Sequence, residues 1–567
     1  MSHARQDQVS DKLFSAAPRA TDPATTVWDA FQCTRQQYGS MPFLHIPAYC
    51  SGGPVDLTYD EMGTAVEATM EVYRRAGYGP GHHVALWLDN RGSFYLHWLT
   101  LNALGATVVP LGAELSVAEA RLLLLRADID LLVHLHDRRS TAQEAATAEA
   151  GDGLSSIATP DDFAANFLPR ASTPRSAGAR VDAAAIVFTS GSMGQPKGCV
   201  LSNDYFLSFG RWYRDLGGRC ELRPGRERLI TPLPLNHVNA LAFSSMGMIL
   251  TGGCIIQLDR FRSSSWWKTV NETEATVMHY LGVMPAMLLQ LPRQPDERTH
   301  NLRFGIGGGV RAAHHSAFED RFAVSLIEAW AMTETGGAGT LSTHVGPRNI
   351  GSGCIGRPSP RYAEATLAGE NGAPLPDPLC PGEGELLVRA SGDEPRRGFS
   401  SGYYKDPDAT AAAWQHAWLH TGDLVRRDAE GCYFFVGRRK QIIRRSGENI
   451  SAAEVEAALG VDQRIQEAAV VAVPDELREE EVFVCVVASA DLTGSRDLAE
   501  GILAAAAARL AYYKLPGYIA FVTALPVTAT QKLRYGTVAQ LATALIRNQG
   551  PELFDVRDAK RNLRSKH

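Results

Sequence analysis

The sequence predicts an α/β protein in which a large N-terminal domain of α/β sheets carries a β subdomain and is followed by a small α+β C-terminal domain. Three observations predict this class. The chain has 567 residues, and at roughly 150 residues per domain that length indicates several structural units. Strand and helix patterns alternate through the first half, as in parallel sheets. From about residue 355 onward, short strands separated by Gly, Pro and Asp turns replace that alternation.

The first half is predicted to alternate helices and strands. A helix opens at 57–61 and continues to Arg75, and a strand follows at 83–88. A long apolar segment at 94–104 separates this strand from a second one at 106–111. Strand, helix and strand at this spacing predict parallel pairing. The region 137–181 is rich in Ala, Ser, Thr and Pro and is predicted to be a surface excursion.

The centre of the chain adds further sheet elements. Strands are predicted at 184–188 and 326–330, and a helix interrupted at Pro285 is predicted over 277–291. The segments 384–388 and 432–436 are short strands of the predicted β subdomain.

A domain boundary is predicted near 437–441, beyond which the pattern is that of a separate α+β unit. Ser451-Ala452-Ala453-Glu454 has the form of a capping box that opens a helix. Two strands and an Ala-rich helix are expected to follow, at 470–473, 482–488 and 497–510. The basic stretch 557–567 is interpreted as a solvated, frayed tail, with a partner-binding arm as the alternative.

Composition and charge exclude several classes of protein. Lys and Arg number 56 against 62 Asp and Glu, a net charge of −6, which does not favour a nucleic-acid binder or an anionic membrane surface. No apolar run reaches the roughly 20 residues that a membrane span requires, and residues 1–26 contain no signal-like segment. The nine cysteines form no C-x-x-C pair, which disfavours a disulfide framework or a zinc site. These features predict a cytoplasmic enzyme.

The most informative segment runs from a buried strand into a loop, Thr189-Ser190-Gly191-Ser192-Met193-Gly194-Gln195-Pro196-Lys197-Gly198. Glycines let backbone N–H groups approach a polyanion, hydroxyls donate further hydrogen bonds, and lysine supplies a mobile charge. This composition suits a nucleotide triphosphate, although a flexible surface loop is the alternative. A Walker loop is excluded because Pro196 stands where that motif needs glycine.

The loop resembles the phosphate-binding motif T-S-G-[ST]-T-G-x-P-K-G of the adenylate-forming superfamily, whose members include acyl-CoA ligases, with Met193 in place of a threonine. The resemblance extends in order from Leu57 to Arg534. It implies nucleotide binding by a set of loop residues, namely Thr189, Ser190, Gly191, Ser192, Gly194 and Lys197.

Further segments resemble the family's nucleotide site. Glu328-Ala329-Trp330-Ala331-Met332-Thr333-Glu334 is similar to its Y-G-M-T-E segment. By that resemblance Trp330 lies beside adenine, Thr333 binds a phosphate and Glu334 holds magnesium. The adenine pocket is implied to be lined by the glycine turn Gly307, Gly308 and Gly309.

Segments nearer the C-terminus complete the series. Gly402-Tyr403-Tyr404-Lys405 is similar to the family's G-Y segment, and Thr421-Gly422-Asp423 to its T-G-D segment, which implies that Asp423 and Arg438 bind the ribose. The resemblance places an N-terminal acid- and ATP-binding domain at 1–437, a hinge at 438–441 centred on Lys440, and a mobile C-terminal lid at 442–567. Lys532 occupies the position of the catalytic lysine. Gln441 and Gln531 depart from the family pattern.

The resemblance implies a two-step reaction that uses ATP, Mg²⁺ and coenzyme A. A carboxylic acid first becomes an acyl adenylate with release of pyrophosphate, and its acyl group then passes to the CoA thiol. Lys532, Thr333, Glu334 and His237 are the implied catalytic residues, with His237 bordering the acid pocket. Residues 228–258 contain no Asp or Glu, and a buried ammonium group without a counter-charge is unfavourable, so an α-amino acid substrate is disfavoured.

Two alternatives stay open at this point. The acceptor could be the phosphopantetheine of a carrier protein instead of free CoA. The departures at Met193, Gln441 and Gln531 also fit a catalytically weak adenylate-binding homologue, against which the retention of Glu334, Asp423, Arg438 and Lys532 argues. The expected partner is a small-molecule carboxylic acid, with or without a carrier protein, and no nucleic acid.

Overall fold

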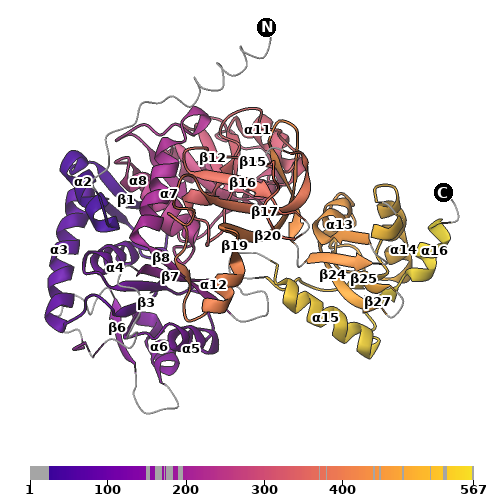
Figure 1. Ribbon diagram of the computed structural model, residues 1–567, viewed down its shortest axis with the longest axis horizontal. Helices are drawn as coiled ribbons and strands as arrows, with labels where there is room; N and C mark the ends of the chain where they lie inside the picture. Colours follow the sequence, from indigo (N-terminus) through magenta and orange to yellow (C-terminus); the bar gives the residue numbers. More distant parts are fainter. Residues whose placement is uncertain are drawn as a thin grey trace, which may run out of the picture.

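The structure is a computed structural model of the chain. It describes residues 24–147, 154–159, 169–171, 173, 183–189, 196–369, 371–377, 380–438, 441–445, 448–475, 478–510, 512–527 and 533–564. These residues form three sheets in two domains, with the small C-terminal domain to one side of the large one (Figure 1). The prediction of a large α/β domain followed by a small α+β domain is confirmed.

The first sheet of the large domain has the strand order β18-β8-β7-β4-β3-β5-β6. Its strands β3 to β7 pair in parallel, whereas β8 returns antiparallel to β7 and carries the short strand β18 at the edge. The strands are β3 (His83–Trp87), β4 (Thr107–Pro110), β5 (Leu131–Leu135), β6 (Ser155–Thr159), β7 (Ala183–Thr189), β8 (Lys197–Ser202) and β18 (Gly402–Tyr403). The accompanying helices are α2 (Val27–Tyr38), α3 (Tyr59–Ala76), α4 (Gly92–Ala103), α5 (Val117–Arg126), α6 (Arg139–Ala146) and α7 (Asn203–Asp215).

The second sheet joins a parallel part to an antiparallel part. Its order is β16-β17-β20-β21-β15-β14-β13-β12-β11-β9-β10-β1-β2. The strands of its parallel part, with the antiparallel edge strand β2, are β1 (Pro42–Ile46), β2 (Val55–Thr58), β9 (Arg228–Thr231), β10 (Cys254–Gln257), β11 (Val277–Leu281), β12 (Phe304–Gly308) and β13 (Ser325–Trp330). The antiparallel part, which confirms the predicted β subdomain, contains β14 (Leu341–Ser342), β15 (Cys354–Pro358), β16 (Ala363–Leu367), β17 (Gly382–Ala390), β19 (Trp414–Gln415), β20 (Trp418–Arg427) and β21 (Tyr433–Arg438). The helices of this region are α8 (Ser245–Ile249), α9 (Trp266–Glu272), α10 (Val283–Gln290), α11 (Ala312–Phe322) and α12 (Pro407–Ala413).

The small domain is built on a third sheet. The strands are β22 (Ile442–Arg445), β23 (Glu448–Ser451), β24 (Ile465–Asp475), β25 (Glu479–Ala488), β26 (Tyr518–Phe521) and β27 (Leu553–Asp555). The helices are α13 (Ala452–Leu459), α14 (Arg496–Ala507), α15 (Tyr535–Asn548) and α16 (Arg557–Arg564). Ser451 caps α13 by accepting the N–H of Glu454, but the Glu454 carboxylate pairs with Lys514 at 2.5 Å. We therefore find only half of the predicted capping box.

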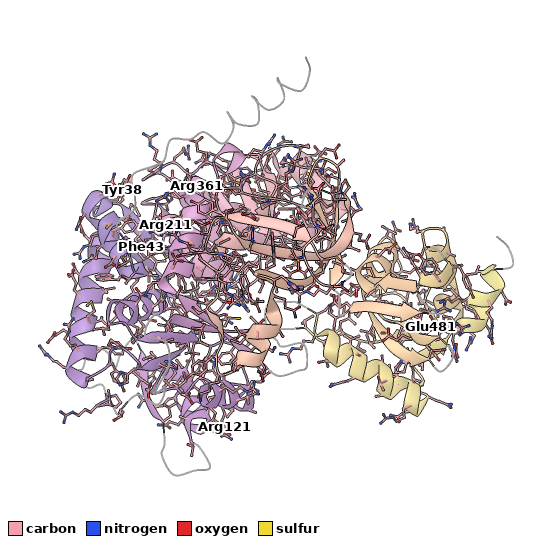
Figure 2. The ribbon with its side chains drawn as sticks, in the orientation of Figure 1. Tyr38, Phe43, Arg121, Arg211, Arg361 and Glu481 are labelled. Atoms are coloured by element: carbon pink, nitrogen blue, oxygen red, sulfur yellow. The ribbon has the colours of Figure 1, made fainter. Side chains whose placement is uncertain are left out.

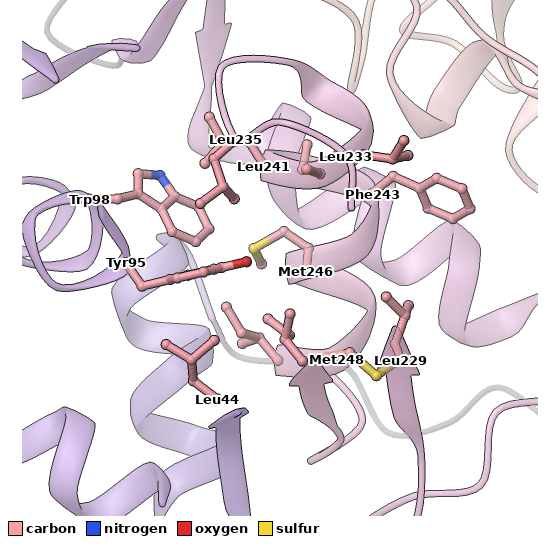
Figure 3. Close-up of a cluster of buried hydrophobic side chains, with 14 of the residues drawn as sticks. Leu44, Tyr95, Trp98, Leu229, Leu233, Leu235, Leu241, Phe243, Met246 and Met248 are labelled. Carbon is pink, nitrogen blue, oxygen red and sulfur yellow. The ribbon is translucent and has the colours of Figure 1, made fainter. Parts of the chain in front are cut away.

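The two domains have separate hydrophobic cores. One buried cluster spans residues 24–327 of the large domain, and Figure 3 shows part of it, where Tyr95 and Trp98 of α4 pack near Leu235 and Met246. The clusters of the small domain contain only residues beyond 442 and lie on the two faces of its sheet. No buried hydrophobic cluster of the described residues therefore combines the two domains.

The region 137–181 was wrongly predicted to be a surface excursion throughout. Helix α6 buries Ala142 and Ala145, and β6 extends the first sheet by pairing in parallel with β5. Alanine has too small a side chain to mark a buried helix face clearly, so the composition resembled that of a loop. Much of the region, including 160–168 and 174–180, lies outside the described residues.

The helix predicted over 277–291, with an interruption at Pro285, is also wrong in its first half and in the place of its interruption. Residues Val277–Leu281 form the buried strand β11 between β9 and β12, and Gly282 separates it from helix α10. Pro285 lies in the first turn of α10, where a backbone N–H has no intrahelical partner and its loss is tolerated. An apolar run that contains few polar residues does not show the period that distinguishes a strand from a helix.

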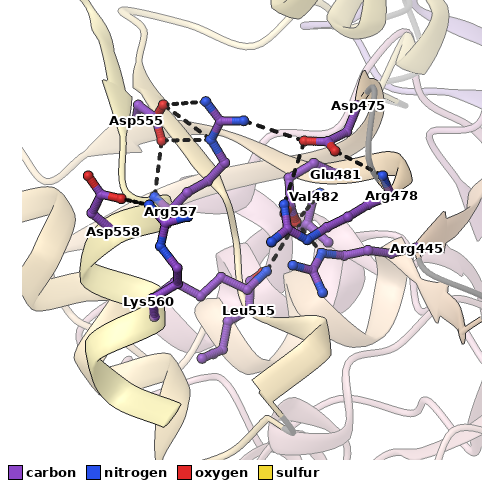
Figure 4. A network of polar contacts seen from close by, with 11 residues as sticks. Arg445, Asp475, Arg478, Glu481, Val482, Leu515, Asp555, Arg557, Asp558 and Lys560 are labelled. Atoms are coloured by element: carbon purple, nitrogen blue, oxygen red, sulfur yellow. Dashed lines mark hydrogen bonds and ion pairs between the residues drawn. The ribbon is translucent and has the colours of Figure 1, made fainter. Parts of the chain in front are cut away.

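The C-terminal stretch is not a frayed tail. Helix α16 covers Arg557–Arg564, and Lys560 is only 1% exposed inside the small domain. Its Nζ lies 3.0 Å from Oε1 of the buried Glu481 and also donates to the carbonyl oxygen of Leu515 (Figure 4; Glu481 is placed within the small domain in Figure 2). Arg445 reaches the same carboxylate oxygen at 2.8 Å. Burial lowers the pKa of Lys560 to about 8.

Candidate active site

The four neighbouring strands β9, β11, β12 and β13 place several predicted site residues at one edge of the second sheet. All four are parallel, so their carboxyl ends meet at the same edge. The His237 segment follows β9, the glycine turn ends β12, and Trp330 ends β13. In open α/β sheets, ligands bind outside the carboxyl ends of the strands.

The glycine turn at this edge is tightly packed. A Cβ on Gly307 would lie 2.1 Å from the carbonyl oxygen of Tyr280, and one on Gly308 would lie 2.8 Å from that of Ala329. Gly309 has a φ of +84°, a conformation that favours glycine. These positions therefore require glycine for backbone reasons, whatever they bind.

The buried carboxylate of Glu328 holds the glycine turn in place, a role that the sequence did not reveal. It accepts the N–H of Gly309 at 3.0 Å and the hydroxyl of Tyr280 at 2.6 Å. Burial raises the pKa of Glu328 above its usual value, and these hydrogen bonds oppose the shift. The available signal was an acidic residue inside an otherwise apolar strand, because such a residue needs buried partners.

Trp330, Asp423 and Arg438 form one contact group. The indole Nε1 of Trp330 donates to Asp423 Oδ2 at 2.9 Å. Asp423 on β20 is opposite Arg438 on β21, whose Nε lies 3.2 Å from Asp423 Oδ1. Asp423 is 2% exposed, and burial raises the pKa of its carboxyl, whereas Arg438 and Trp330 favour the ionised form. Among the described residues, Oδ1 has no hydrogen bond of good geometry besides its ion-pair contact with Arg438.

The phosphate-loop segment is a β-hairpin whose ends are described. Thr189 at the end of β7 pairs with Lys197 at the start of β8, and its hydroxyl lies 3.4 Å from the Lys197 carbonyl oxygen. The predicted loop residues Ser190, Gly191, Ser192 and Gly194 lie outside the described residues, as does Met193.

Tyr403 connects this hairpin to Glu334. The Nζ of Lys197 lies 4.8 Å from the centre of the Tyr403 ring, and the Tyr403 hydroxyl donates to Glu334 Oε1 at 2.8 Å. Glu334 is 8% exposed, and its neighbour Thr333 is half-buried in the turn that follows β13. Burial, together with the nearby carboxylate, raises the pKa of Tyr403 far above its usual value, so the phenol remains a donor. The G-Y segment was recognised in the sequence, but this contact was not.

His237 is partly buried in a turn between β9 and a segment of π-helix at Asn239–Ser244. The backbone N–H of His237 donates to the carbonyl oxygen of Pro234 at 3.1 Å, and its backbone carbonyl oxygen accepts the N–H of Leu241 at 3.0 Å. Leu233, Leu235, Leu241 and Phe243 on either side of it are buried (Figure 3). Buried apolar side chains on both sides therefore anchor the segment at the carboxyl-end edge of the second sheet.

Lys440 and Lys532 both lie outside the described residues. Two positions after Lys532 in the sequence, Arg534 is described, and its Nη2 atom lies 3.6 Å from Glu119 Oε1 on helix α5 of the large domain. The last residue of the same helix, Arg126, donates to the carbonyl oxygen of Pro196 at 2.6 Å. Helix α5 thus contacts both the phosphate-loop segment and the chain that follows Lys532.

Known proteins resemble this chain in sequence and in architecture. Residues 35–404 match the model of the AMP-binding enzyme family, and residues 454–532 match the AMP-binding enzyme C-terminal domain. A sulfoacetate–CoA ligase of Cupriavidus necator is 31% identical over 83% of this chain and 89% of its own length. A crotonobetaine/carnitine–CoA ligase of Proteus mirabilis is 29% identical over 84% and 92%.

Solved structures agree on the fold. ATP-bound MatB from Rhodopseudomonas palustris superposes with a TM-score of 0.76 at 23% identity, covering 91% of this chain and 98% of that one. No helix among the described residues is long and apolar enough to cross a membrane. The match over most of the chain, in the order of the motifs, shows that the protein belongs to the AMP-binding enzyme family of the adenylate-forming superfamily.

Proposed function

We propose that the protein is an ATP-dependent acyl-CoA ligase that activates a small-molecule carboxylic acid as an acyl adenylate and then transfers the acyl group to coenzyme A. The observation that carries this proposal is the pair of contact groups in the large domain. One is Trp330–Asp423–Arg438, and the other is Lys197–Tyr403–Glu334. The CoA ligases among the relatives support the choice of acceptor.

The first contact group suits a nucleoside. A carboxylate oxygen has two lone pairs and can accept the hydroxyls of a ribose, and Asp423 Oδ1 has only the ion-pair contact with Arg438 among the described residues. Arg438 stands beside it as a second ribose contact. We assign the ring of Trp330 and the turn Gly307–Gly309 to the two sides of the adenine.

The second contact group suits the phosphate chain. Lys197 brings a positive charge to the end of the phosphate loop, and we assign the remaining phosphate contacts to Thr189, Ser190, Gly191, Ser192, Gly194 and Thr333. The described residues contain no group of three His, Cys, Asp or Glu that could hold a metal. A single carboxylate is nevertheless sufficient for Mg²⁺, which is usually bound through one or two carboxylates and substrate phosphates. Glu334 fits that role, and a bound Mg²⁺ would neutralise charge on the departing pyrophosphate.

The reaction proceeds in two displacements. An oxygen of the substrate carboxylate attacks the α-phosphorus, the bond between that phosphorus and its bridging oxygen breaks, and pyrophosphate leaves. The CoA thiol then loses its proton to solvent and attacks the acyl carbon, and the bond from that carbon to the phosphate oxygen breaks, so that AMP leaves with the electron pair. Lys532 is proposed to hold the carboxylate and the nucleotide together in the first step, since charge-assisted hydrogen bonds contribute about 1.5–3 kcal/mol each.

We further propose that the small domain, 442–567, turns about 438–441 at Lys440 between the two steps, so that Lys532 withdraws and the thiol enters. The domain at 1–437 would stay in place with the acyl adenylate. His237 borders the acid in this proposal. The absence of Asp and Glu from 228–258 argues against a substrate ammonium group.

The division of labour can be tested with Lys532→Ala. We expect pyrophosphate release from ATP and acid to be abolished, while thioester formation from supplied acyl adenylate largely survives, because Lys532 acts only in the first step. Loss of both half-reactions to the same extent would contradict this assignment.

The substrates can be tested with a panel of carboxylic acids, measuring pyrophosphate release with and without CoA. A CoA-dependent thioester product supports the proposal. Release without a CoA ester indicates a carrier-protein acceptor, and no release with any acid indicates a catalytically weak homologue.

A further inference from the structure

We propose that Tyr403 is a positioning residue that fixes the side chains of Lys197 and Glu334 relative to each other. The ammonium group of Lys197 and the metal ion bound by Glu334 can then contact the same phosphate chain. This inference rests on the proposed function of Glu334 and Lys197 and extends it to a residue outside the implied catalytic set. Tyr403 touches neither nucleotide nor metal in this proposal, and it acts through the two residues that do.

The backbone of Tyr403 is fixed from both sides. Strand β18 pairs with β8, with Tyr403 opposite Cys199, only two residues after Lys197. The backbone N–H of Ser401 donates to the carbonyl oxygen of Val200 at 2.8 Å, and the backbone N–H of Tyr404 donates to the carbonyl oxygen of Gly198 at 2.7 Å. The position of Tyr403 is therefore set by the same strand that begins at Lys197.

The same short segment also holds Glu334. The N–H of Ser400 donates to the backbone carbonyl oxygen of Glu334 at 2.9 Å, and the Tyr403 hydroxyl donates to its Oε1 at 2.8 Å. Backbone and side chain of Glu334 are thus both bonded to residues 400–403. With Oε1 engaged by the phenol, Oε2 is the oxygen that the carboxylate can present to a cation.

The ring and the hydroxyl of Tyr403 have separable functions. The ring lies 4.8 Å from Lys197 Nζ, within the range of a cation–π contact. Among the described residues, the hydroxyl donates to Glu334. Removing the hydroxyl should therefore impair metal binding, whereas removing the ring should also weaken the contact of Lys197 with phosphate.

The neighbouring residue provides a matched control. Tyr404 also donates its hydroxyl to a carboxylate, Asp128 Oδ2 at 2.7 Å, but Asp128 lies between α5 and β5 and belongs to neither contact group. Tyr403→Phe and Tyr404→Phe therefore remove the same atom, from the same segment, with the same type of partner.

The experiment measures Mn²⁺ binding by electron paramagnetic resonance in the presence of α,β-methylene-ATP, which cannot release pyrophosphate. We expect Tyr403→Phe to weaken Mn²⁺ binding about tenfold, the loss typical of a hydrogen bond to a charged group, and Tyr404→Phe to leave it unchanged. Calorimetric titration of metal-free α,β-methylene-ATP in EDTA should give the same Kd for Tyr403→Phe and the unmodified protein. Tyr403→Leu should raise that Kd about threefold, because the ring is lost.

Glu334→Gln in the same Mn²⁺ assay distinguishes the proposed metal-binding role of Glu334 from the proposed positioning role of Tyr403. If Glu334→Gln binds Mn²⁺ normally, the proposed metal role of Glu334 is wrong, and the inference on Tyr403 is wrong with it. If Glu334→Gln loses Mn²⁺ but Tyr403→Phe behaves like Tyr404→Phe, the positioning role alone is overturned. Tyr403→Phe keeps the ring and its packing, so a folding defect does not obscure the comparison.

Discussion

The indole of Trp330 contributes a hydrogen bond as well as an aromatic surface. A tyrosine, which the family usually has at this position, carries its donor at the far end of the ring, whereas the indole N–H is on the side of the ring system. Here that N–H reaches Asp423 at 2.9 Å, and it favours the ionised carboxylate against the effect of burial. The substitution therefore couples the proposed adenine and ribose contacts directly.

We predict that Trp330→Phe, which keeps a ring and loses the donor, raises the KM for ATP about tenfold, the typical effect of losing a hydrogen bond to a charged group. The measurement is pyrophosphate release at varied ATP concentration. Trp414→Phe serves as the control, since Trp414 is equally buried in the same cluster but packs against Phe399. An equal effect of both substitutions would attribute the loss to packing.

The same pair predicts a pH dependence. Burial already places the pKa of Asp423 above that of an ordinary aspartate, so ATP affinity should fall on acidification as the carboxylate gains a proton. Loss of the indole N–H removes a contact that lowers this pKa. In Trp330→Phe the acidic limb of the KM profile should therefore move to higher pH, and a limb that stays in place would argue against the coupling.

At the scale of elements, the sequence predicts those helices and strands that show a hydrophobic period or a local start or stop signal. Helix α3 opens at Thr58 with its capping box, and β7 runs into a glycine-rich loop, and both patterns are visible in one dimension. Strand β11 and helix α10 share one apolar run, and their separation depends on neighbouring strands that only the folded chain supplies. Of the site, the motif residues could be predicted, but Glu328 and the Tyr403 contact could not, because each depends on partners far away in the sequence.

Helix α16 shows the same limit, since a basic stretch gives no sign that one of its lysines is buried. Lys560 finds Glu481 on β25, 79 positions earlier in the chain. Glu481 has two cationic partners, Lys560 and Arg445, so removing Lys560 weakens the compensation of its buried charge without abolishing it. The anchoring of this helix is therefore a property of the pair and of its burial.

We predict that Lys560→Met lowers the free energy of unfolding of the small domain by about 2 kcal/mol, the typical loss for a hydrogen bond to a charged group, because Arg445 remains paired with Glu481. Thermal or urea unfolding followed by circular dichroism measures the change. Arg561→Met is the control, because Arg561 is exposed and pairs only with Asp558 on its own helix, and exposed pairs contribute roughly 0–1 kcal/mol. Equal stability of both variants would mean that α16 is not anchored through Lys560.

At the scale of the whole molecule, the ion pair between Arg534 and Glu119 joins the two domains, and Arg534 follows Lys532 by two positions in the sequence. Both side chains are about half exposed, so the contact is weak and depends on ionic strength. A weak contact is suitable if the small domain must leave this arrangement in every catalytic cycle.

We predict that Glu119→Gln slows pyrophosphate release about twofold at low salt and leaves thioester formation from supplied acyl adenylate unchanged. Glutamine can still accept the hydrogen bonds from Ser116 that start α5, so the helix cap is kept. High salt should abolish the difference between the variant and the unmodified protein. A twofold effect that persists in high salt would point to altered packing.

The separate cores of the two domains mean that heating need not unfold the protein in one event. Each domain can melt on its own, so calorimetry should resolve two transitions, and a single melting temperature would not describe the chain. Trp330 and Asp423, proposed to contact adenine and ribose, belong to the larger unit, so ATP would protect that unit by mass action. If the small domain melts first, protein warmed past that transition could still bind nucleotide through the large domain, although catalytic turnover is lost.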